Sequence, residues 1–137
     1  MSVIHISDEP LDIAAHEAAA AHGAAGATVL FLGVVRDHDH GRTVTSLEYE
    51  GHPSAQQVLE DVAAKFRADP EVRGLAISHR VGQLAIGDLA LVAAVSAAHR
   101  AEAFRLCAEL VDEVKHALPI WKRQVFADGS DEWVNCP

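Results

Sequence analysis

The stretch AHRAEAFRLCAELVDEVKHALPIWKRQVF, residues 98–126, combines a long helical pattern with an extended one. Up to Leu118 the apolar residues recur as they do on one side of an α-helix. Pro119 cannot continue that helix, because it lacks an amide hydrogen and its ring clashes with the preceding turn. The segment IWKRQVF that follows alternates as an extended chain does. The stretch therefore predicts a helix followed directly by a strand.

Two cations fall on the apolar side of this predicted helix. At about 100° per residue, one line along the helix collects Phe104, Cys107, Ala108, Val111, Val114 and Leu118. Arg100 in the first turn and Lys115 in the last project onto the same side. Either both side chains extend past the ends of the core, with Lys115 also favoured by the helix dipole, or they serve a ligand.

Lysine is scarce in this chain, and two of its three copies lie on either side of Pro119. Lys115, Lys122 and Arg123 therefore crowd one corner. Like charges packed together cost free energy unless an anion or carboxylates offset them, and crowding with burial would lower the pKa of a lysine. A phosphate-bearing ligand is a natural occupant of this corner.

A second candidate anion site lies at the start of the same helix. His99 and Arg100 stand where the free amide groups and the dipole of a helix already favour anions. The sixteen residues from His99 to Lys115 span about 24 Å as a helix, at about 1.5 Å per residue. One ligand can use both sites only if two subunits supply them, so we expect a homodimer with a composite site.

The rest of the chain alternates helical and extended patterns. Ser7, Asp8, Glu9 and Pro10 resemble a helix start, and Gly23 a helix end. A further helix is expected over 53–69, and strands over 27–36, 43–50, 72–82 and 88–96, the first of them buried on both faces. Interleaved strands and helices favour a mixed α/β domain.

Composition limits the class of protein. The chain has 137 residues, a formal net charge of −9 and a pI near 5.3. Its length fits one domain over 1–137. The acidity argues against a general nucleic-acid or anionic-membrane surface, since spread positive charge holds both partners. Any anion must therefore bind at a local cluster of cations.

The apolar runs predict no membrane span. The longest, 89–98 and 27–35, are too short to cross a bilayer. The N-terminus lacks the basic and then apolar order of a secretory signal. Cys107 and Cys136 form no CxxC pair. We therefore expect a cytoplasmic protein with reduced thiols.

The segment DHDHG, residues 37–41, alternates aspartate with histidine and suggests a metal site. Alternate residues of an extended segment point to opposite faces, so these side chains make no ready set of ligands. We expect no metal there, and a solvated loop near the anion pocket.

Five segments carry a resemblance to a known family. In chain order they are FLGVVRDHDHG (31–41), LEYEGHP (47–53), SHRVGQLAIGD (78–88), AAHRAEAF (97–104) and KHALPIWKR (115–123). Each is weak alone, whereas five in order at suitable spacing are highly specific. From about Phe31 to Val134 the chain resembles the large, catalytic subunits of molybdopterin synthase, the MoaE family.

This resemblance implies a fold, a reaction and a partner. The fold is a mixed α/β domain of the hammerhead type, with mostly antiparallel strands. The reaction converts cyclic pyranopterin monophosphate to molybdopterin, with sulfur from a thiocarboxylate on the C-terminal Gly-Gly of a small ubiquitin-like subunit. The assembly is a homodimer within a heterotetramer, and the chemistry requires no metal or redox cofactor because the sulfur arrives activated.

The resemblance also assigns roles to individual residues. Lys115 is implied as the principal catalytic lysine and Lys122 as its partner. The implied substrate contacts are Arg36, the backbone of Val34 and Val35, His99 and Arg100 from the other subunit, and Arg123 and Gln124 at the border of the pocket. Gln124 departs from the family, which more often has glutamate after the WK pair, so the charge that this acid supplies is missing at that position.

A second interpretation uses the same cations without catalysis. A dimeric sensor for a phosphorylated metabolite would also need a local cluster of positive charge. Such a sensor would tolerate Lys115→Arg, which keeps the charge, whereas a catalyst that needs the smaller head or the proton of lysine would not.

Overall fold

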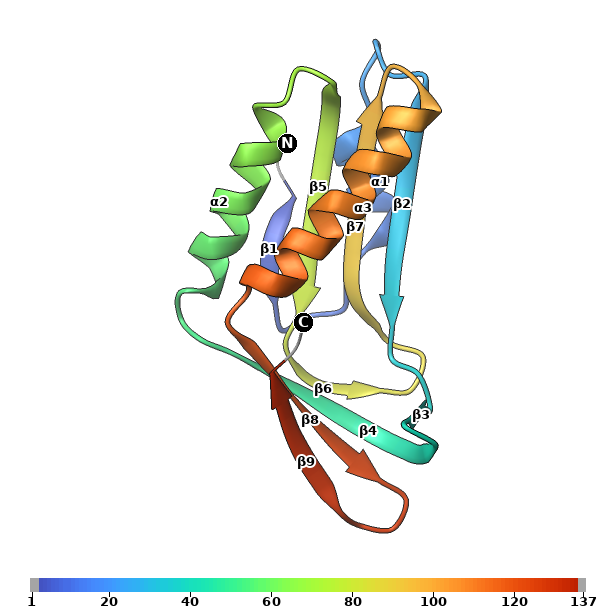
Figure 1. Ribbon diagram of the computed structural model, residues 1–137, viewed down its shortest axis with the longest axis vertical. Coiled ribbons are helices and arrows are strands. Elements are labelled where there is room, and N and C mark those ends of the chain that lie inside the picture. The colour runs from blue at the N-terminus through green and yellow to red at the C-terminus, as the bar shows by residue number, and fades with distance from the viewer. Residues whose placement is uncertain (1–2, 136–137) are drawn as a thin grey trace.

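The main layer of the computed structural model, which describes residues 3–135, is a four-stranded sheet (Figure 1). Its strands, in spatial order, are β1 (Ile4–Ser7), β5 (Val72–Arg80), β7 (Leu89–Ala97) and β2 (Ala27–Val34). β1 and β5 are parallel, whereas β5–β7 and β7–β2 are antiparallel. Leu75, Ile77, Leu91 and Val95 on the two central strands are buried at about 1% exposure or less, so the core lies over this part of the sheet.

Helices cover both faces of the main sheet. α2 (Ala55–Arg67) and α3 (Arg100–Ala117) lie side by side on one face, and α1 (Ile13–Ala20) lies on the other (Figure 1). α2 turns Leu59, Ala63 and Phe66 to the core, with the spacing expected for an amphipathic helix. An ion pair of 2.6 Å between Lys65 Nζ and Glu113 Oε1 joins α2 to α3 near the surface.

A second, smaller sheet extends from one end of the main layer (Figure 1). It contains β3 (His38–Asp39), β4 (Arg42–Gly51), β8 (Ile120–Phe126) and β9 (Asp131–Asn135), and β6 (Gly82–Ala85) pairs with β4. All of its pairings are antiparallel. The predicted mixed fold with mostly antiparallel strands is confirmed, as is the prediction of a helix followed directly by a strand around Pro119. This α3–Pro119–β8 connection leads from the helix on the main sheet into the second sheet.

The N-terminal part differs from the prediction. Ser7 to Pro10 do not begin a helix, because residues up to Ser7 form β1, which pairs with β5. α1 starts later, where the carboxylate of Asp12 accepts a hydrogen bond from Ala15 N at 3.1 Å. The helix ends at Ala20 rather than at Gly23. A short edge strand with few residues carries too little periodicity to stand out from the sequence.

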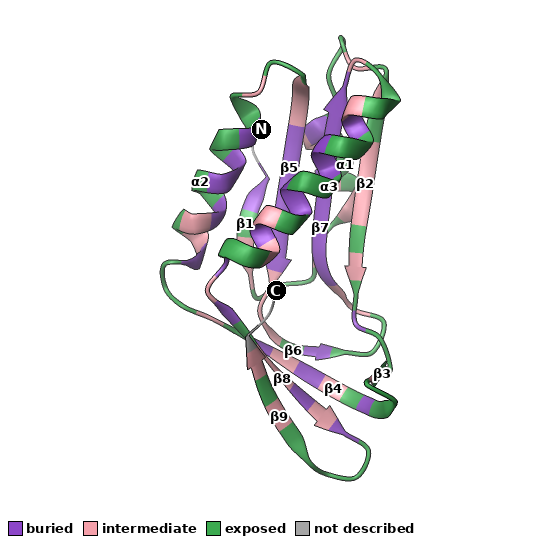
Figure 2. Cartoon of the chain, in the orientation of Figure 1, coloured by how far each residue is buried: buried purple, intermediate pink, exposed green. Residues whose placement is uncertain are grey.

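The prediction that β2 is buried on both faces is wrong. β2 lies at the edge of the sheet, and its Leu32 and Val34 are 38% and 53% exposed. The helical wheel of α3 is also shifted, because Phe104 is 62% exposed and Ala108 is exposed, while Ala103, Leu106 and Leu110 are buried. Figure 2 shows buried and exposed parts alternating along α3. Both β2 and α3 thus carry exposed apolar residues that packing within one chain does not account for.

Candidate active site

The two lysines of the opening stretch lie where the main sheet meets the small sheet. Lys115 is in the last turn of α3 and Lys122 is in β8, and both are half-buried. Leu118 and Pro119 separate the two elements, so the chain changes from helix to strand over two residues. In the small sheet Lys122 is paired with Tyr49 of β4, which places both side chains on one face.

Tyr49 and His79 form an aromatic pair beside the lysines. Their rings meet edge to face, with centroids 4.9 Å apart and an interplanar angle of 82°. His79 is 4% exposed, and its Nδ1 lies 2.7 Å from the carbonyl oxygen of Arg80, so Nδ1 carries the proton. Burial lowers the pKa of His79 to about 4, and the positive charge of Lys115 acts in the same direction. A neutral imidazole therefore lies within electrostatic reach of Lys115.

Arg36 and Gln124 meet on one carboxylate. Arg36 Nη2 lies 3.1 Å from Asp39 Oδ1, and Gln124 Nε2 donates to Asp39 Oδ2 at 2.7 Å. The hydrogen bond from Gln124 lowers the pKa of Asp39, with further contributions from His40, Lys122 and Arg36. Arg36, Lys122 and Gln124, which were predicted to share a site, are therefore linked through Asp39.

The backbone of Val34 and Val35 was predicted to contact substrate, but the amide and carbonyl groups of Val35 are already hydrogen-bonded within the protein. The amide of Val35 donates to Asp88 O at 3.0 Å, and its carbonyl accepts from Gly87 N at 2.8 Å. Val35 is buried, whereas the preceding Val34 is exposed. These bonds fix the end of β2 against the turn before β7, so they orient the following residue, Arg36, toward the small sheet.

Arg123 lies on the opposite side of β8 from Lys122 and Gln124, because successive residues of a strand point to opposite faces. Its Nε donates to Asp131 Oδ2 of β9 at 2.7 Å. Arg123 is thus held at the outer border of the corner and is already paired with an acid. Its predicted role as a pocket residue stays a prediction.

His99 and Arg100 are at the far end of α3 from Lys115. His99 is the N-cap residue, and its side chain makes no capping hydrogen bond within residues 3–135. Both side chains are exposed. The helix is continuous for 18 residues, which corresponds to about 27 Å at about 1.5 Å per residue, so one chain does not bring the two cation sites together.

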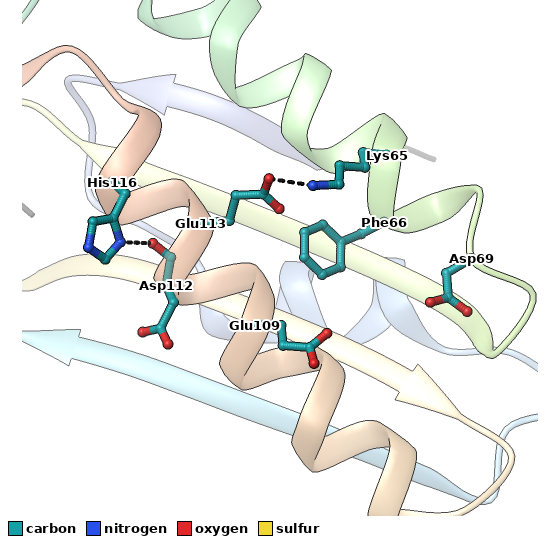
Figure 3. Close-up of a pocket in the computed structure, with 7 residues that line it drawn as sticks. All are labelled: Lys65, Phe66, Asp69, Glu109, Asp112, Glu113 and His116. Carbon is teal, nitrogen blue, oxygen red and sulfur yellow. Dashed lines mark hydrogen bonds and ion pairs between the residues drawn. The ribbon is translucent and has the colours of Figure 1, made fainter.

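A separate groove of about 510 Å³ lies between α2 and α3. Its lining contains four carboxylates, Asp69, Glu109, Asp112 and Glu113, together with Lys65, Phe66 and His116 (Figure 3). Lys65 is already paired with Glu113 there. An excess of negative charge repels a phosphate, so this groove is not the anion pocket that the sequence predicted.

The DHDHG segment does not gather its side chains around one point. The described residues contain no group of three or more His, Cys, Asp or Glu side chains arranged to hold a metal ion. His38 Nδ1 instead lies 2.9 Å from the neighbouring Asp37 Oδ1. Both of those side chains are well exposed.

Comparison with known proteins matches this arrangement to a family. The model of the MoaE protein family matches residues 6–117. The chain belongs to the MoaE family. A relative from Nostoc sp., described as a molybdopterin synthase catalytic subunit, is 39% identical over 132 residues, which cover 95% of this chain and 80% of the relative.

Solved structures agree with the family assignment. Molybdopterin synthase from Staphylococcus aureus has a TM-score of 0.88 and 31% identity, with 98% of each chain covered. A complex of subunits 1 and 2 of the molybdopterin-converting factor from Helicobacter pylori has a TM-score of 0.74, with 97% of this chain and 90% of that chain covered; at 22% identity it shows the fold alone. The expectation of an enzyme of the molybdopterin synthase type is confirmed by these MoaE relatives.

The sequence did not identify three further residues at the corner where Lys115, Lys122 and Arg36 meet. Tyr49 and His79 lie within segments that carried the family resemblance, and neither was assigned a role there. Asp39 was treated as part of a solvated loop, yet its side chain is only 13% exposed. A charge-balance argument was the available signal, because three crowded cations require a nearby carboxylate.

Proposed function

We propose that this chain converts cyclic pyranopterin monophosphate to molybdopterin as a sulfurtransferase. The sulfur comes from the C-terminal Gly-Gly thiocarboxylate of a small ubiquitin-like partner subunit. The observation that carries the proposal is the convergence of Lys115, Lys122 and Arg36 around Tyr49, His79 and Asp39 at one corner. The MoaE relatives, which are molybdopterin synthase catalytic subunits, support the same reaction.

Fixed cations suit this chemistry because negative charge grows during the reaction. Opening the cyclic phosphate leaves a monoester with more negative charge, which Arg36 and the lysines stabilise. Arginine adds a forked pair of donors that matches two phosphate oxygens. Lys115 is the principal catalytic lysine, with Lys122 as its partner.

The lysines can assist the reaction in two ways. The thiocarboxylate sulfur bonds to the pterin side chain, and water then cleaves the resulting thioester, leaving the sulfur on the pterin and a carboxylate on the carrier. Attack of that water gives the thioester carbonyl oxyanion character, which an ammonium group stabilises. A lysine can also move the protons that accompany loss of water from the pterin side chain. The neutral imidazole of His79 adds no competing positive charge at this point, because its pKa is lowered to about 4 by burial.

The second anion site, His99 and Arg100, serves the same substrate across a homodimer. β2 is an edge strand with exposed Leu32 and Val34, and α3, which packs on β2, carries an exposed Phe104. An exposed apolar edge of this kind requires a cover, and a second copy of the chain supplies one.

The strand register gives the geometry of this dimer. One end of β2, at Ala27, pairs with Ala97 close to His99, and the other end, at Val34, leads directly to Arg36. β2 has eight residues and spans about 26 Å, close to the length of α3. A two-fold axis that packs the two β2 edges antiparallel would bring His99 and Arg100 of one protomer to Arg36 of the other.

The small partner subunit binds at the same corner, with its extended Gly-Gly tail directed at the lysines. Glycine suits a narrow entry, because it has no side chain to exclude.

We place the resulting heterotetramer in the cytoplasm. No helix in the described part of the chain is long and apolar enough to span a membrane.

The test is a single-turnover conversion of cyclic pyranopterin monophosphate by the purified chain with a thiocarboxylated small subunit. We expect product from the wild type, almost none from Lys115→Ala, and little from Lys115→Arg, because arginine keeps the charge but not the proton-transfer chemistry. A folded wild type that binds the substrate and makes no product with an authentic partner would favour the sensor interpretation instead.

A further inference from the structure

Asp39 occupies the centre of the polar network at the corner of the two sheets. Its side chain is 13% exposed, and its two oxygens face different partners. Oδ1 lies 3.1 Å from Arg36 Nη2 and 3.8 Å from His40 Nε2, while Oδ2 accepts from Gln124 Nε2 at 2.7 Å. Lys122 is close enough to act on the same carboxylate electrostatically.

A tight turn fixes the backbone of Asp39. β3 and β4 form a hairpin in which Asp39 pairs with Arg42, so only His40 and Gly41 remain in the loop. Both loop residues have positive φ, 50° and 77°, as a type I′ turn requires. Asp39 is therefore held against β8 by the hairpin, and the position of its carboxylate does not depend on a long flexible loop.

Gln124 lies between two acids. Its Nε2 donates to Asp39 at 2.7 Å and also to Glu132 Oε1 at 3.3 Å, and the residue is 3% exposed. The amide satisfies both carboxylates without adding charge. A glutamate at position 124 would put three carboxylates in contact, whereas glutamine leaves Asp39 as the acid that faces the cations.

Arg36 can exchange its partner Asp39 for a phosphate at little cost. Arg36 is 67% exposed, so water and salt screen the pair and little free energy is lost when it opens. A phosphate offers the guanidinium the same kind of forked acceptor as a carboxylate. The arginine can thus leave Asp39 for a phosphate without leaving a buried charge unpaired, because Gln124 still donates to Asp39.

We propose that Asp39 is a positioning residue. It holds Arg36 while no substrate is bound and releases it to the phosphate when the substrate binds. Gln124 keeps Asp39 itself in place. This inference rests on the proposed function for the identity of the substrate. Its effect on anion binding can be measured without turnover. Exchanging the carboxylate and the amide between positions 39 and 124 keeps the net charge of the network but moves the carboxylate from beside Arg36 to beside Glu132.

The experiment compares the wild type with Asp39→Asn, Gln124→Glu and the double exchange Asp39→Asn/Gln124→Glu. Binding of inorganic phosphate is measured by calorimetry at low ionic strength, thermal unfolding checks the fold, and single-turnover conversion gives the rate. The control is Asp128→Asn, which removes a carboxylate of the small sheet at the β8–β9 turn, where it pairs with Arg42 at 3.5 Å.

We expect Asp39→Asn to bind phosphate about threefold more tightly, because the competing charge is gone, and to turn over about tenfold more slowly, because Arg36 is no longer placed. Gln124→Glu should bind phosphate about threefold more weakly. The double exchange should return the phosphate affinity to within about twofold of the wild type, because the net charge is restored, but it should stay about tenfold slow in turnover, because an amide in place of the carboxylate still faces Arg36. The control should leave both quantities within about twofold of the wild type.

A single-turnover rate in the double exchange that returns to that of the wild type would overturn the inference, because the net charge of the network would then matter and the place of the carboxylate would not. An unchanged phosphate affinity in Asp39→Asn would also overturn it. The outcomes separate this inference from the proposed function. If the wild type makes no product but the phosphate affinities shift as expected, the proposed reaction fails and the role of Asp39 toward anions stands. If product forms equally well in all four proteins, the reaction stands and the role of Asp39 fails.

Discussion

At the residue scale, the corner combines charged side chains with a histidine that stays neutral. Lys115, Lys122 and Arg36 supply positive charge, and Asp39 offsets part of it. His79 is buried against Tyr49, and its Nδ1–H donates a hydrogen bond to the carbonyl oxygen of Arg80. Burial thus decides the protonation state of His79 at neutral pH, and the histidine adds no charge to the three cations already there.

The neutral state of His79 makes stability depend on pH. The ordinary pKa is 6.5 and the pKa in the folded protein is about 4. Between these values the unfolded chain binds a proton that the folded chain does not, so the free energy of unfolding falls as the pH falls from 6.5 to 4. The loss amounts to about 3 kcal/mol at about 1.4 kcal/mol per pH unit.

The measurement is urea unfolding of the wild type and His79→Phe at several pH values between 4 and 7. Phenylalanine keeps a ring against Tyr49 and does not titrate. The wild type should lose stability relative to the variant as the pH falls. Parallel curves for the two proteins would show that His79 is protonated in the folded state.

Cys107 is expected to be unreactive in the folded protein. It is 3% exposed within α3, and burial raises the pKa of its thiol to about 11. The thiolate is the reactive form, so little of it exists at pH 8. In a Cys136→Ser background, a thiol reagent should label Cys107 only after denaturant is added. Rapid labelling of the native protein would contradict the burial of this side chain.

At the element scale, the connection from α3 through Pro119 to β8 was predictable, because proline and a change of period both appear in the sequence. α2 and the two central strands were predictable for the same reason. The exposure of β2 was not, because an apolar edge strand has the same composition as a buried one. The error at Phe104 has the same origin, since apolar residues on a helix can face either a core or a second protein.

The candidate site, too, was only partly predictable from the sequence. The cations were visible in the sequence because lysine is scarce and two of three copies flank one proline. Asp39 and His79 were not identified, because their roles come from contacts between segments far apart in the chain, such as Asp39 with Gln124 at a separation of 85 residues. Sequence patterns report local periodicity, whereas these contacts require the tertiary fold.

The packing of α1 on β5 depends on one glycine. A Cβ on Gly74 would lie 2.2 Å from the carbonyl oxygen of Ala20 and 2.7 Å from its carbonyl carbon. That oxygen also accepts a hydrogen bond from Ser96 Oγ, so it cannot move without cost. We expect Gly74→Ala to lower the free energy of unfolding by about 1–3 kcal/mol.

Urea unfolding of Gly74→Ala checks this value, with Gly23→Ala as the matched control. Nothing lies within 4 Å of a Cβ at Gly23. The control should change stability by less than about 1 kcal/mol. Equal stabilities of the two variants would mean that α1 does not press on β5 as described.

At the scale of the whole molecule, the two cation sites lie at opposite ends of α3. The edge strand β2, with its exposed apolar residues, extends from the end near His99 to the end that leads to Arg36. A single chain cannot use both sites for one substrate. The proposed two-fold dimer would account together for the separation of the sites and for the exposure of Leu32, Val34 and Phe104.

Disrupting that edge should produce monomers. We expect Leu32→Glu and Phe104→Glu to shift the chain from dimer to monomer, because a charge would be buried without a partner in the interface. Sedimentation velocity measures the mass. Trp133→Glu is the control, since Trp133 is 49% exposed on β9 of the small sheet, away from β2. Dimers in both edge variants would place the interface elsewhere.

The central claim is that one active site combines Lys115 of one protomer with Arg100 of the other. Lys115→Ala and Arg100→Ala chains, each inactive alone, would be co-expressed with different tags and assayed in single turnover with the thiocarboxylated small subunit. Random pairing makes half of the dimers mixed, and each mixed dimer has one intact site, so we predict about a quarter of the wild-type activity. No activity in the isolated mixed dimers would contradict the composite site, because every site would then lack one of its own residues.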